Sequence, residues 1–119
     1  MLKLFGIPNC DTVKKTQKWL DKHGIEYEFH DYKKQGISKK QLTEWCNQLE
    51  WETLLNKRSR TWKQLNSNTI GKGNLSNLTQ VNAINLMQQH PTLIKRPITQ
   101  QGEIIVVGFN EETFKDQFK

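Results

Sequence analysis

The chain has few cysteines, and their spacing does not fit the usual roles of paired cysteines. Cys10 and Cys46 are the only two among 119 residues, and they are too far apart for a metal-ligand spacing and too few for a disulfide framework. In a reducing compartment both are expected to be thiols at rest. The sequence therefore predicts no metal site, and any chemistry at cysteine must begin from a single thiol.

Long apolar stretches are absent as well. No window approaches the roughly 18 apolar residues that cross a membrane. The opening MLKLFGIPN lacks the apolar core and the cleavage site of a signal peptide. The expectation is a cytoplasmic protein with no membrane partner. A length of 119 residues suits one domain with one hydrophobic core, and nothing in the sequence requires more than a monomer.

The middle of the chain has no acidic residues. Residues 53–102 contain neither Asp nor Glu, in a chain of net charge +6. Such a block can bind an oxyanion, a carboxylate-bearing peptide thiol or a nucleic-acid backbone, or it can be a solvated basic face. No RNA-recognition signature accompanies it, so nucleic acid is not expected. The basic residues of the block are Lys57, Arg58, Arg60, Lys63, Lys72, Lys95 and Arg96.

The first part of the chain predicts a β-α-β unit. Apolar residues over 2–7 predict a buried strand, residues 12–23 a helix that Gly24 ends, and the alternation over 25–32 a second strand. Near the end, 97–107 predicts a β-hairpin, and a last helix follows.

Between these parts the sequence predicts helices. Ser38 with Gln41 forms a capping-box pattern before an apolar stripe that includes Cys46. Residues 66–77, rich in Asn, Ser and Gly, predict a loop, and Ser76 is expected to cap a further helix. The whole order predicts an α/β, thioredoxin-like fold with a four-stranded mixed sheet flanked by helices. It would be one domain over 1–119, with a helical insertion at about 35–92.

Cys10 stands where the first strand ends and the first helix begins. A helix N-terminus presents unpaired N–H groups and the positive end of the dipole, which favour a thiolate and predict a lowered thiol pKa. The carboxylate of Asp11 acts in the opposite direction, because an anion beside the sulfur is expected to raise the thiol pKa. Thr12 can donate its hydroxyl or amide to the sulfur, and Asn9 can orient a ligand or simply fix the turn. The alternative is an ordinary loop thiol.

A partner for Cys10 is missing from the sequence around it. The position where a dithiol site would have its second cysteine is Val13, and Cys46 is expected to pack in the core as a small hydrophobe. Any redox cycle at Cys10 must therefore use a second thiol from outside the chain. Glutathione, a carboxylate-bearing tripeptide, is the expected source, and the acid-free basic block suits its charge.

Five stretches carry a resemblance to a known family. They lie in order from the first strand to residue 114, so nearly the whole chain is covered. The sequence resembles the arsenate reductase/Spx family, in particular its YffB-like branch, and HPTLIKRPI is the most specific of the shared motifs. The five stretches are LFGIPNCDTVKKTQKWL, IEYEFHDYKKQGIS, WETLLNKRSRTWKQL, QQHPTLIKRPI and VVGFNEETF.

The resemblance implies a function as well as a thioredoxin-like fold with a helical insertion. It implies that Cys10 is a nucleophile, and that a cis peptide bond at Pro97 turns the chain toward the site, with Arg96 pointing its guanidinium at the cysteine. Arg96 would then support the thiolate and offer a forked donor to an anion or a glutathione carboxylate. The leading interpretation is a glutathione-dependent thiol reductase, regenerated by glutathione or by glutaredoxin.

The departures from the family pattern leave two other functions open. Arsenate reductases of this kind have further arginines near Asn56 and Gly108, where this chain has none, although Arg58 or Arg60 can replace the first. A true arsenate reductase is therefore the third interpretation. The second is an Spx-like regulator that binds the RNA polymerase α subunit without catalysis. Trp62 follows Arg58 and Arg60, so an arginine can stack on its ring.

Overall fold

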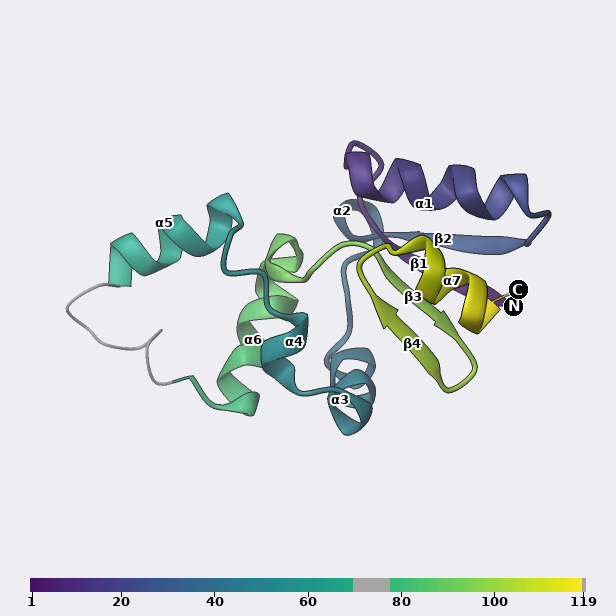
Figure 1. Cartoon of the computed structure of the whole chain (residues 1–119). Helices are drawn as coiled ribbons and strands as arrows, with labels where there is room; N and C mark the ends of the chain where they lie inside the picture. Colours follow the sequence, from purple (N-terminus) through teal and green to yellow (C-terminus); the bar gives the residue numbers. More distant parts are fainter. Residues whose placement is uncertain (70–77, 119) are drawn as a thin grey trace. The chain divides into compact units, whose positions relative to one another are not determined.

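The computed structural model describes residues 1–69 and 78–118 and divides the chain into two compact units (Figure 1). One unit combines Met1–Gln35 with Lys95–Lys119, and the other is Gly36–Ile94. Within the described residues, no helix has both the length and the apolar character needed to cross a membrane. The same part of the chain contains no group of three or more His, Cys, Asp or Glu side chains that could hold a metal ion.

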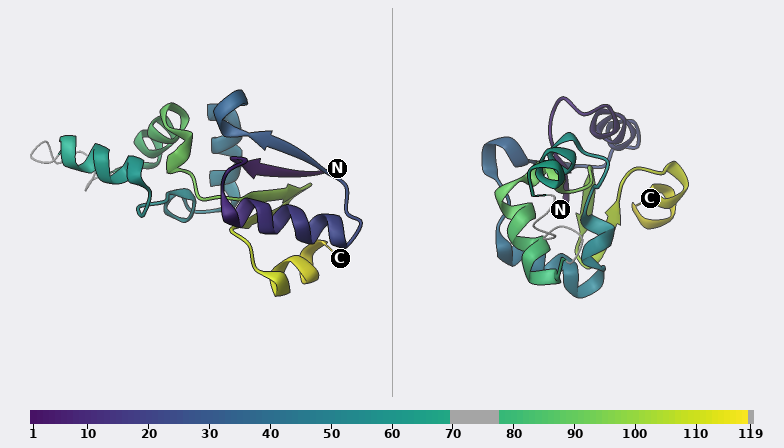
Figure 2. Two further views of the ribbon diagram at one scale, coloured as in Figure 1. Left: turned by 90° about the horizontal axis from the view of Figure 1, so that it is seen from above. Right: turned by 90° about the vertical axis from the view of Figure 1, so that its left-hand side faces the viewer.

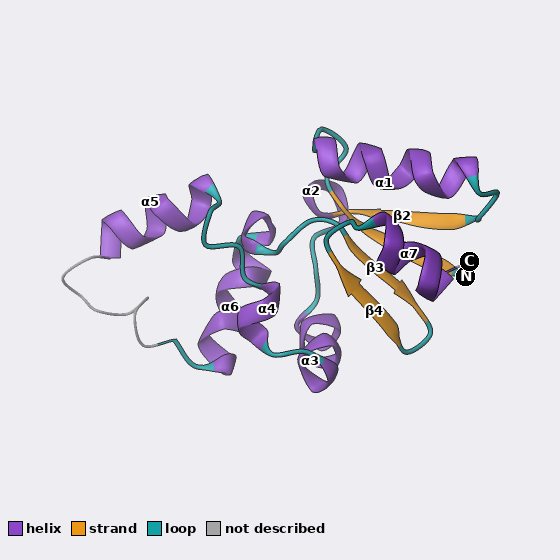
Figure 3. Cartoon of the chain, viewed as in Figure 1, coloured by secondary structure: helices purple, strands orange, loops and turns teal. Residues whose placement is uncertain are grey.

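The first unit is built on a mixed sheet of four strands in the order β2-β1-β3-β4 (Figure 3). β1 and β2 are parallel, whereas β3 is antiparallel to both β1 and β4. This confirms the predicted four-stranded mixed sheet and thioredoxin-like fold. The strands are β1 (Leu2–Gly6), β2 (Tyr27–Asp31), β3 (Ile98–Gln101) and β4 (Ile104–Val107).

Two helices of this unit cover one face of the sheet. α1 (Asp11–Lys22) and α7 (Glu111–Phe118) lie along the strands (Figure 2). Their apolar side chains pack on those of β1, because alternate strand residues point to the same face. Trp19 of α1 meets Phe114 of α7 edge to face, with ring centroids 5.4 Å apart. The buried residues of this core are Leu2, Leu4, Val13, Trp19, Leu20 and Phe114.

The sheet topology brings four chain segments to one edge. β1 and β2 are parallel, so their carboxyl ends share an edge, and the antiparallel β3 begins there. That edge therefore carries residues 7–10, Tyr32, and residues 95–97. Gly108, which follows β4, lies there too, and its backbone N–H donates to the Pro97 carbonyl at 2.8 Å. Ligand sites of open α/β sheets form at edges of this kind.

The second unit is helical. Ser38 accepts a hydrogen bond from the Gln41 backbone N–H at 3.1 Å, as the capping-box pattern predicts. Leu55, which follows α4, and Ile94, the last residue of the unit, form an isolated antiparallel bridge. The elements of the unit are α3 (Lys39–Gln48), α4 (Trp51–Leu54), α5 (Arg60–Thr69), α6 (Gln80–Gln89) and the 3-10 helix η1 (Pro91–Leu93), while α2 (Tyr32–Gln35) belongs to the first unit.

The predicted loop over 66–77 is wrong for its first residues, because α5 runs on to Thr69. The helix has an N-terminal hydrogen bond that the prediction overlooked: the Ser59 hydroxyl accepts from the Trp62 backbone N–H at 3.1 Å. Asn and Ser are only weakly unfavourable within a helix. Residues 70–77, with the predicted cap Ser76, lie outside the described residues. The observed cap of α6 is Thr79, which accepts from the Asn82 N–H at 3.3 Å.

Candidate functional site

Cys10 occupies the N-cap position of α1. Its backbone is extended, with φ −102° and ψ 125°, and its carbonyl accepts the first helical hydrogen bond, from the Lys14 N–H at 3.0 Å. The thiol is half-buried and makes no capping hydrogen bond. The sulfur is therefore attached to the residue that precedes the unpaired N–H groups of the first turn, at the positive end of the helix dipole.

The position of Cys10 depends on a close approach between β1 and α1. A Cβ built on Gly6, the last residue of β1, would lie 2.7 Å from Cγ2 of Val13. Val13 is fully buried, so the position of a second cysteine in a dithiol site is part of the core here. Glycine at position 6 thus allows the first turn of α1, with Cys10 before it, to sit directly against the end of the strand.

The Arg96–Pro97 peptide bond is cis, which confirms the expectation drawn from the resemblance. Pro97 is buried and Arg96 is half-buried. The Pro97 carbonyl is held by the Gly108 N–H. Gly108 has a φ of +81°, in the left-handed region that favours glycine. The resemblance places an arginine of arsenate reductases at this position. Here the positive φ favours glycine instead.

Asn9 and Thr12 stand on either side of Cys10. Asn9 is exposed in the turn that follows β1, and Thr12 is half-buried in the first turn of α1. The Thr12 carbonyl accepts the Thr16 hydroxyl at 2.8 Å. Both residues thus belong to the sheet edge that also carries Arg96 and Pro97. Their contact with a ligand stays a prediction.

Arg58 and Arg60 belong to the helical unit and are exposed. Asn56 organises the turn before α5. Its backbone N–H donates to the Leu93 carbonyl at 2.6 Å, and its Oδ1 accepts from the Arg58 backbone N–H at 3.1 Å. The cation over the Trp62 ring is Lys57, whose Nζ lies 5.8 Å from the ring centroid. The role of the two arginines in anion binding stays a prediction.

Cys46 lies on α3 next to the fully buried Trp45, and is half-buried. Burial raises the pKa of its thiol above the ordinary value, which reduces its thiolate fraction at neutral pH. A half-buried thiol on the same helix as a buried tryptophan packs as a small apolar group. The second thiol is therefore suited to packing rather than to nucleophilic attack.

We expect Cys46→Ala to cost about 1 kcal/mol of unfolding free energy through lost packing and to leave the chemistry of Cys10 unchanged. Urea unfolding followed by Trp fluorescence measures the first effect, and the rate of thiol alkylation measures the second. A folded Cys46→Ala protein without thiol reactivity at position 10 would contradict this assignment of the two cysteines.

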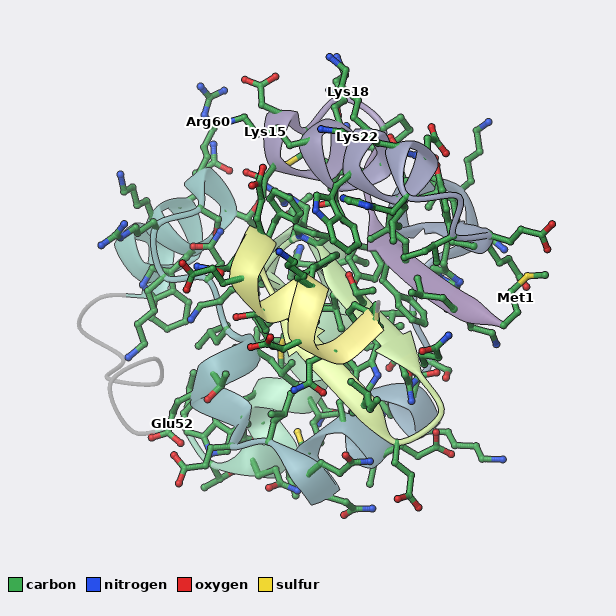
Figure 4. The ribbon with its side chains drawn as sticks, turned by 45° about the vertical axis from the view of Figure 1, so that its right-hand side comes forward. Met1, Lys15, Lys18, Lys22, Glu52 and Arg60 are labelled. Carbon is green, nitrogen blue, oxygen red and sulfur yellow. The ribbon has the colours of Figure 1, made fainter. Side chains whose placement is uncertain are left out.

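A basic hollow between α1 and the start of α7 is a feature that the sequence interpretation did not single out. Lys15, Lys18 and Lys22 come from α1 (Figure 4), at the spacing i, i+3 and i+7 that places residues on one helix face. This spacing of lysines in the sequence is the signal that predicts a basic face on the helix. The hollow is lined by Lys15, Lys18, Trp19, Lys22, His23, Phe109 and Glu111.

Comparison with known proteins decides the family. A family model described as the ArsC family matches residues 5–117. The chain belongs to the ArsC family. This confirms the resemblance to the arsenate reductase/Spx family, because the match extends over nearly the whole sequence.

Individual relatives of this ArsC family member include proteins with different names. An uncharacterised protein of Haemophilus influenzae is 41% identical over 118 residues, which cover 99% of both chains. The global transcriptional regulator Spx of Streptococcus mutans is 26% identical over 117 residues, which cover 97% of this chain and 81% of that protein.

Two solved structures that are each 36% identical to this chain show the same fold. The YffB protein is 36% identical, with a TM-score of 0.90 and 100% of both chains covered. An arsenate reductase (ArsC) related protein of Brucella melitensis is also 36% identical, with a TM-score of 0.74, and 99% of this chain and 94% of that chain are covered. The chain is therefore similar both to a protein named as related to arsenate reductase and to a protein named as a transcriptional regulator.

Proposed function

We propose that this ArsC family protein is a glutathione-dependent thiol reductase with Cys10 as its single nucleophile. The observation that supports this most strongly is the position of Cys10, at the N-cap of a helix of 12 residues, on the sheet edge that carries Arg96 and the cis Pro97. A single thiol at a helix N-terminus, with an arginine at the same edge of the sheet, suits attack on a sulfur atom of a substrate that carries an anionic group.

The chemical step is thiol–disulfide exchange. The Cys10 thiolate attacks one sulfur of a substrate disulfide; a mixed disulfide with Cys10 forms, and the other half leaves as a thiolate, which takes a proton from water. A glutathione thiolate then displaces the bound half, which leaves glutathione on Cys10. A second glutathione, or a glutaredoxin, attacks that mixed disulfide. The Cys10 thiolate is the leaving group, the product is oxidised glutathione or, when a glutaredoxin attacks, a glutaredoxin–glutathione mixed disulfide, and two electrons have passed to the substrate.

The proposed binding residues act on charge and orientation. Arg96 offers a guanidinium to the thiolate and to a glutathione carboxylate. Asn9 and Thr12, on either side of the nucleophile, supply an amide and a hydroxyl, and Pro97 supplies backbone contacts. Arg58 and Arg60 are proposed as further anion-binding residues.

The test is incubation with oxidised glutathione followed by mass measurement of the intact protein. We expect one glutathione adduct on the wild type and on Cys46→Ser, and none on Cys10→Ser. The Cys46 variant is the matched control, because it also removes one thiol. An adduct that forms equally on Cys10→Ser would contradict the proposal.

The second candidate function is an Spx-like regulator that binds the RNA polymerase α subunit. It is favoured by the identity with the regulator of Streptococcus mutans over 97% of this chain. A Cys10→Ser protein separates the two functions in a pull-down with the purified α subunit. The regulator would be favoured if both the wild type and Cys10→Ser bind the α subunit and neither protein forms a glutathione adduct.

Arsenate reduction is the third candidate. Two positions that carry arginine in arsenate reductases are occupied here by Asn56, which organises a turn, and by Gly108, whose backbone has a positive φ. Arg96 is thus the arginine that remains at the sheet edge in the first unit. Arsenite production coupled to glutathione and glutaredoxin, and lost in Cys10→Ala, would favour this function over the other two.

A further inference from the structure

Tyr32 carries a buried hydroxyl at the sheet edge of Cys10. The residue follows β2 directly, and 2% of its surface is exposed. Among the residues that the structure describes, none hydrogen-bonds the Tyr32 hydroxyl. Burying a hydroxyl without a partner costs about 1–3 kcal/mol, and a phenylalanine would fill the same space without that cost. The hydroxyl therefore calls for a function other than packing.

The ring of Tyr32 is held in place from two sides. It lies nearly parallel to Phe5 of β1, with centroids 6.4 Å apart and 27° between the planes. It also meets His30 of β2 at 6.0 Å in a T-shaped contact. The Phe5 and His30 rings are themselves 5.0 Å apart. The rings of Phe5 and His30, on the parallel strands β1 and β2, thus fix the direction of the Tyr32 side chain.

The backbone at Tyr32 is fixed as well. Asp31 accepts the Lys33 N–H on its Oδ1 at 2.9 Å, and the Asp31 N–H donates to Oε1 of Gln35 at 3.1 Å. These two hydrogen bonds close the turn of α2 around Tyr32. A hydroxyl held by its ring contacts and by its turn is preorganised for a ligand, because little conformational freedom is lost on binding.

Arg96 supplies the charge that acts on this hydroxyl. Burial raises the pKa of Tyr32 above its ordinary value, and the Arg96 guanidinium opposes that effect. Tyr32 therefore stays protonated at neutral pH and remains a donor. Guanidinium groups are donors only, so what these two side chains can share is an acceptor oxygen, ideally one with negative charge.

We propose that the Tyr32 hydroxyl and the Arg96 guanidinium form a subsite for a carboxylate or inorganic oxyanion at the Cys10 edge of the sheet. The inference rests on the proposed function, in which Arg96 binds the anionic group of a thiol substrate, and it adds the second donor. The chemistry shared by a glutathione carboxylate and by a small oxyanion is a negatively charged oxygen that accepts two hydrogen bonds.

The test uses the two tyrosines of the chain. Protein labelled with carbon-13 at the tyrosine Cζ is titrated with S-methylglutathione, which cannot react with Cys10, and separately with sulfate at constant ionic strength. We expect the Tyr32 signal to shift with either probe and the Tyr27 signal to stay. A shift with only S-methylglutathione restricts the subsite to carboxylates, and a shift with both extends it to oxyanions. An unmoved Tyr32 signal with both probes overturns the proposal.

Tyr32→Phe removes the hydroxyl alone, and Tyr27→Phe is the matched control from the other end of β2. Since a hydrogen bond to a charged group contributes about 1.5–3 kcal/mol, Tyr32→Phe should weaken probe binding about tenfold or more, whereas Tyr27→Phe should not. The melting temperature of Tyr32→Phe should equal or exceed that of the wild type. Unchanged probe affinity in folded Tyr32→Phe means that the hydroxyl binds water only, and the proposal fails.

The failure of this subsite is distinguishable from the failure of the proposed function. If wild-type protein forms the Cys10 adduct with oxidised glutathione but Tyr32→Phe binds the probes as well as wild type does, the reductase stands and the subsite falls. If the probes bind through Tyr32 but no adduct forms on Cys10, the subsite stands and the reductase falls.

Discussion

Arg96→Gln is expected to slow the reaction of Cys10 with oxidised glutathione about tenfold or more. A charge-assisted hydrogen bond contributes about 1.5–3 kcal/mol, and about 1.4 kcal/mol corresponds to a factor of ten. In the proposed function the guanidinium has two roles: it supports the Cys10 thiolate and it holds the anionic group of the incoming disulfide. Stopped reactions analysed by mass measurement of the intact protein give the rate.

Lys95→Gln is the matched control for this experiment. Lys95 is the preceding residue, is half-buried like Arg96, and loses the same charge on substitution. We expect its rate to stay within about twofold of wild type, because the proposed function gives Lys95 no contact with the thiolate or the substrate. Arg96→Lys should fall between the two, because lysine keeps the charge but lacks the fork. Equal slowing in Lys95→Gln and Arg96→Gln would show that only the net charge matters.

Much of the first unit could be predicted because its signals are local. The strand over residues 2–6, the helix that Gly24 ends and the hairpin before α7 follow from hydrophobic period and turn residues. The position of Cys10 before the helix follows from these too, since Pro8 and Asn9 form the turn. The cis bond at Pro97 came from the resemblance, because nothing in the local sequence distinguishes it from a trans bond.

Other features of the molecule depend on contacts that sequence does not display. The sequence predicts Tyr32 as the end of a strand, whereas its ring contact with Phe5 joins residues that are far apart along the chain. Trp62 has a lysine over its ring because the turn at Asn56 brings Lys57 there, while the arginines are exposed. These contacts depend on where the strands, helices and turns lie relative to one another within each unit. The composition and the hydrophobic periodicity of the sequence do not determine that placement.

The Gly6 position makes the second strong prediction, which concerns stability. Gly6→Ala should lower the unfolding free energy by about 1–3 kcal/mol, the usual cost of overpacking a filled core. The new methyl would meet Cγ2 of Val13 at 2.7 Å, and Val13 is fully buried. The φ of Gly6 is not positive, so the loss comes from the clash and not from the backbone. Urea unfolding measures it.

The same clash displaces the first turn of α1, so Gly6→Ala should also slow the reaction of Cys10 with oxidised glutathione. Val13→Ala provides the control, because the Cβ of residue 13 lies at an ordinary 3.8 Å from the added methyl while the offending Cγ2 is gone. Adding Gly6→Ala to Val13→Ala should therefore cost little or even stabilise, since alanine restricts the unfolded chain more than glycine does. Equal losses in the two backgrounds would mean that the strand and helix do not meet at these two residues. In that case the position of Cys10 must depend on other contacts.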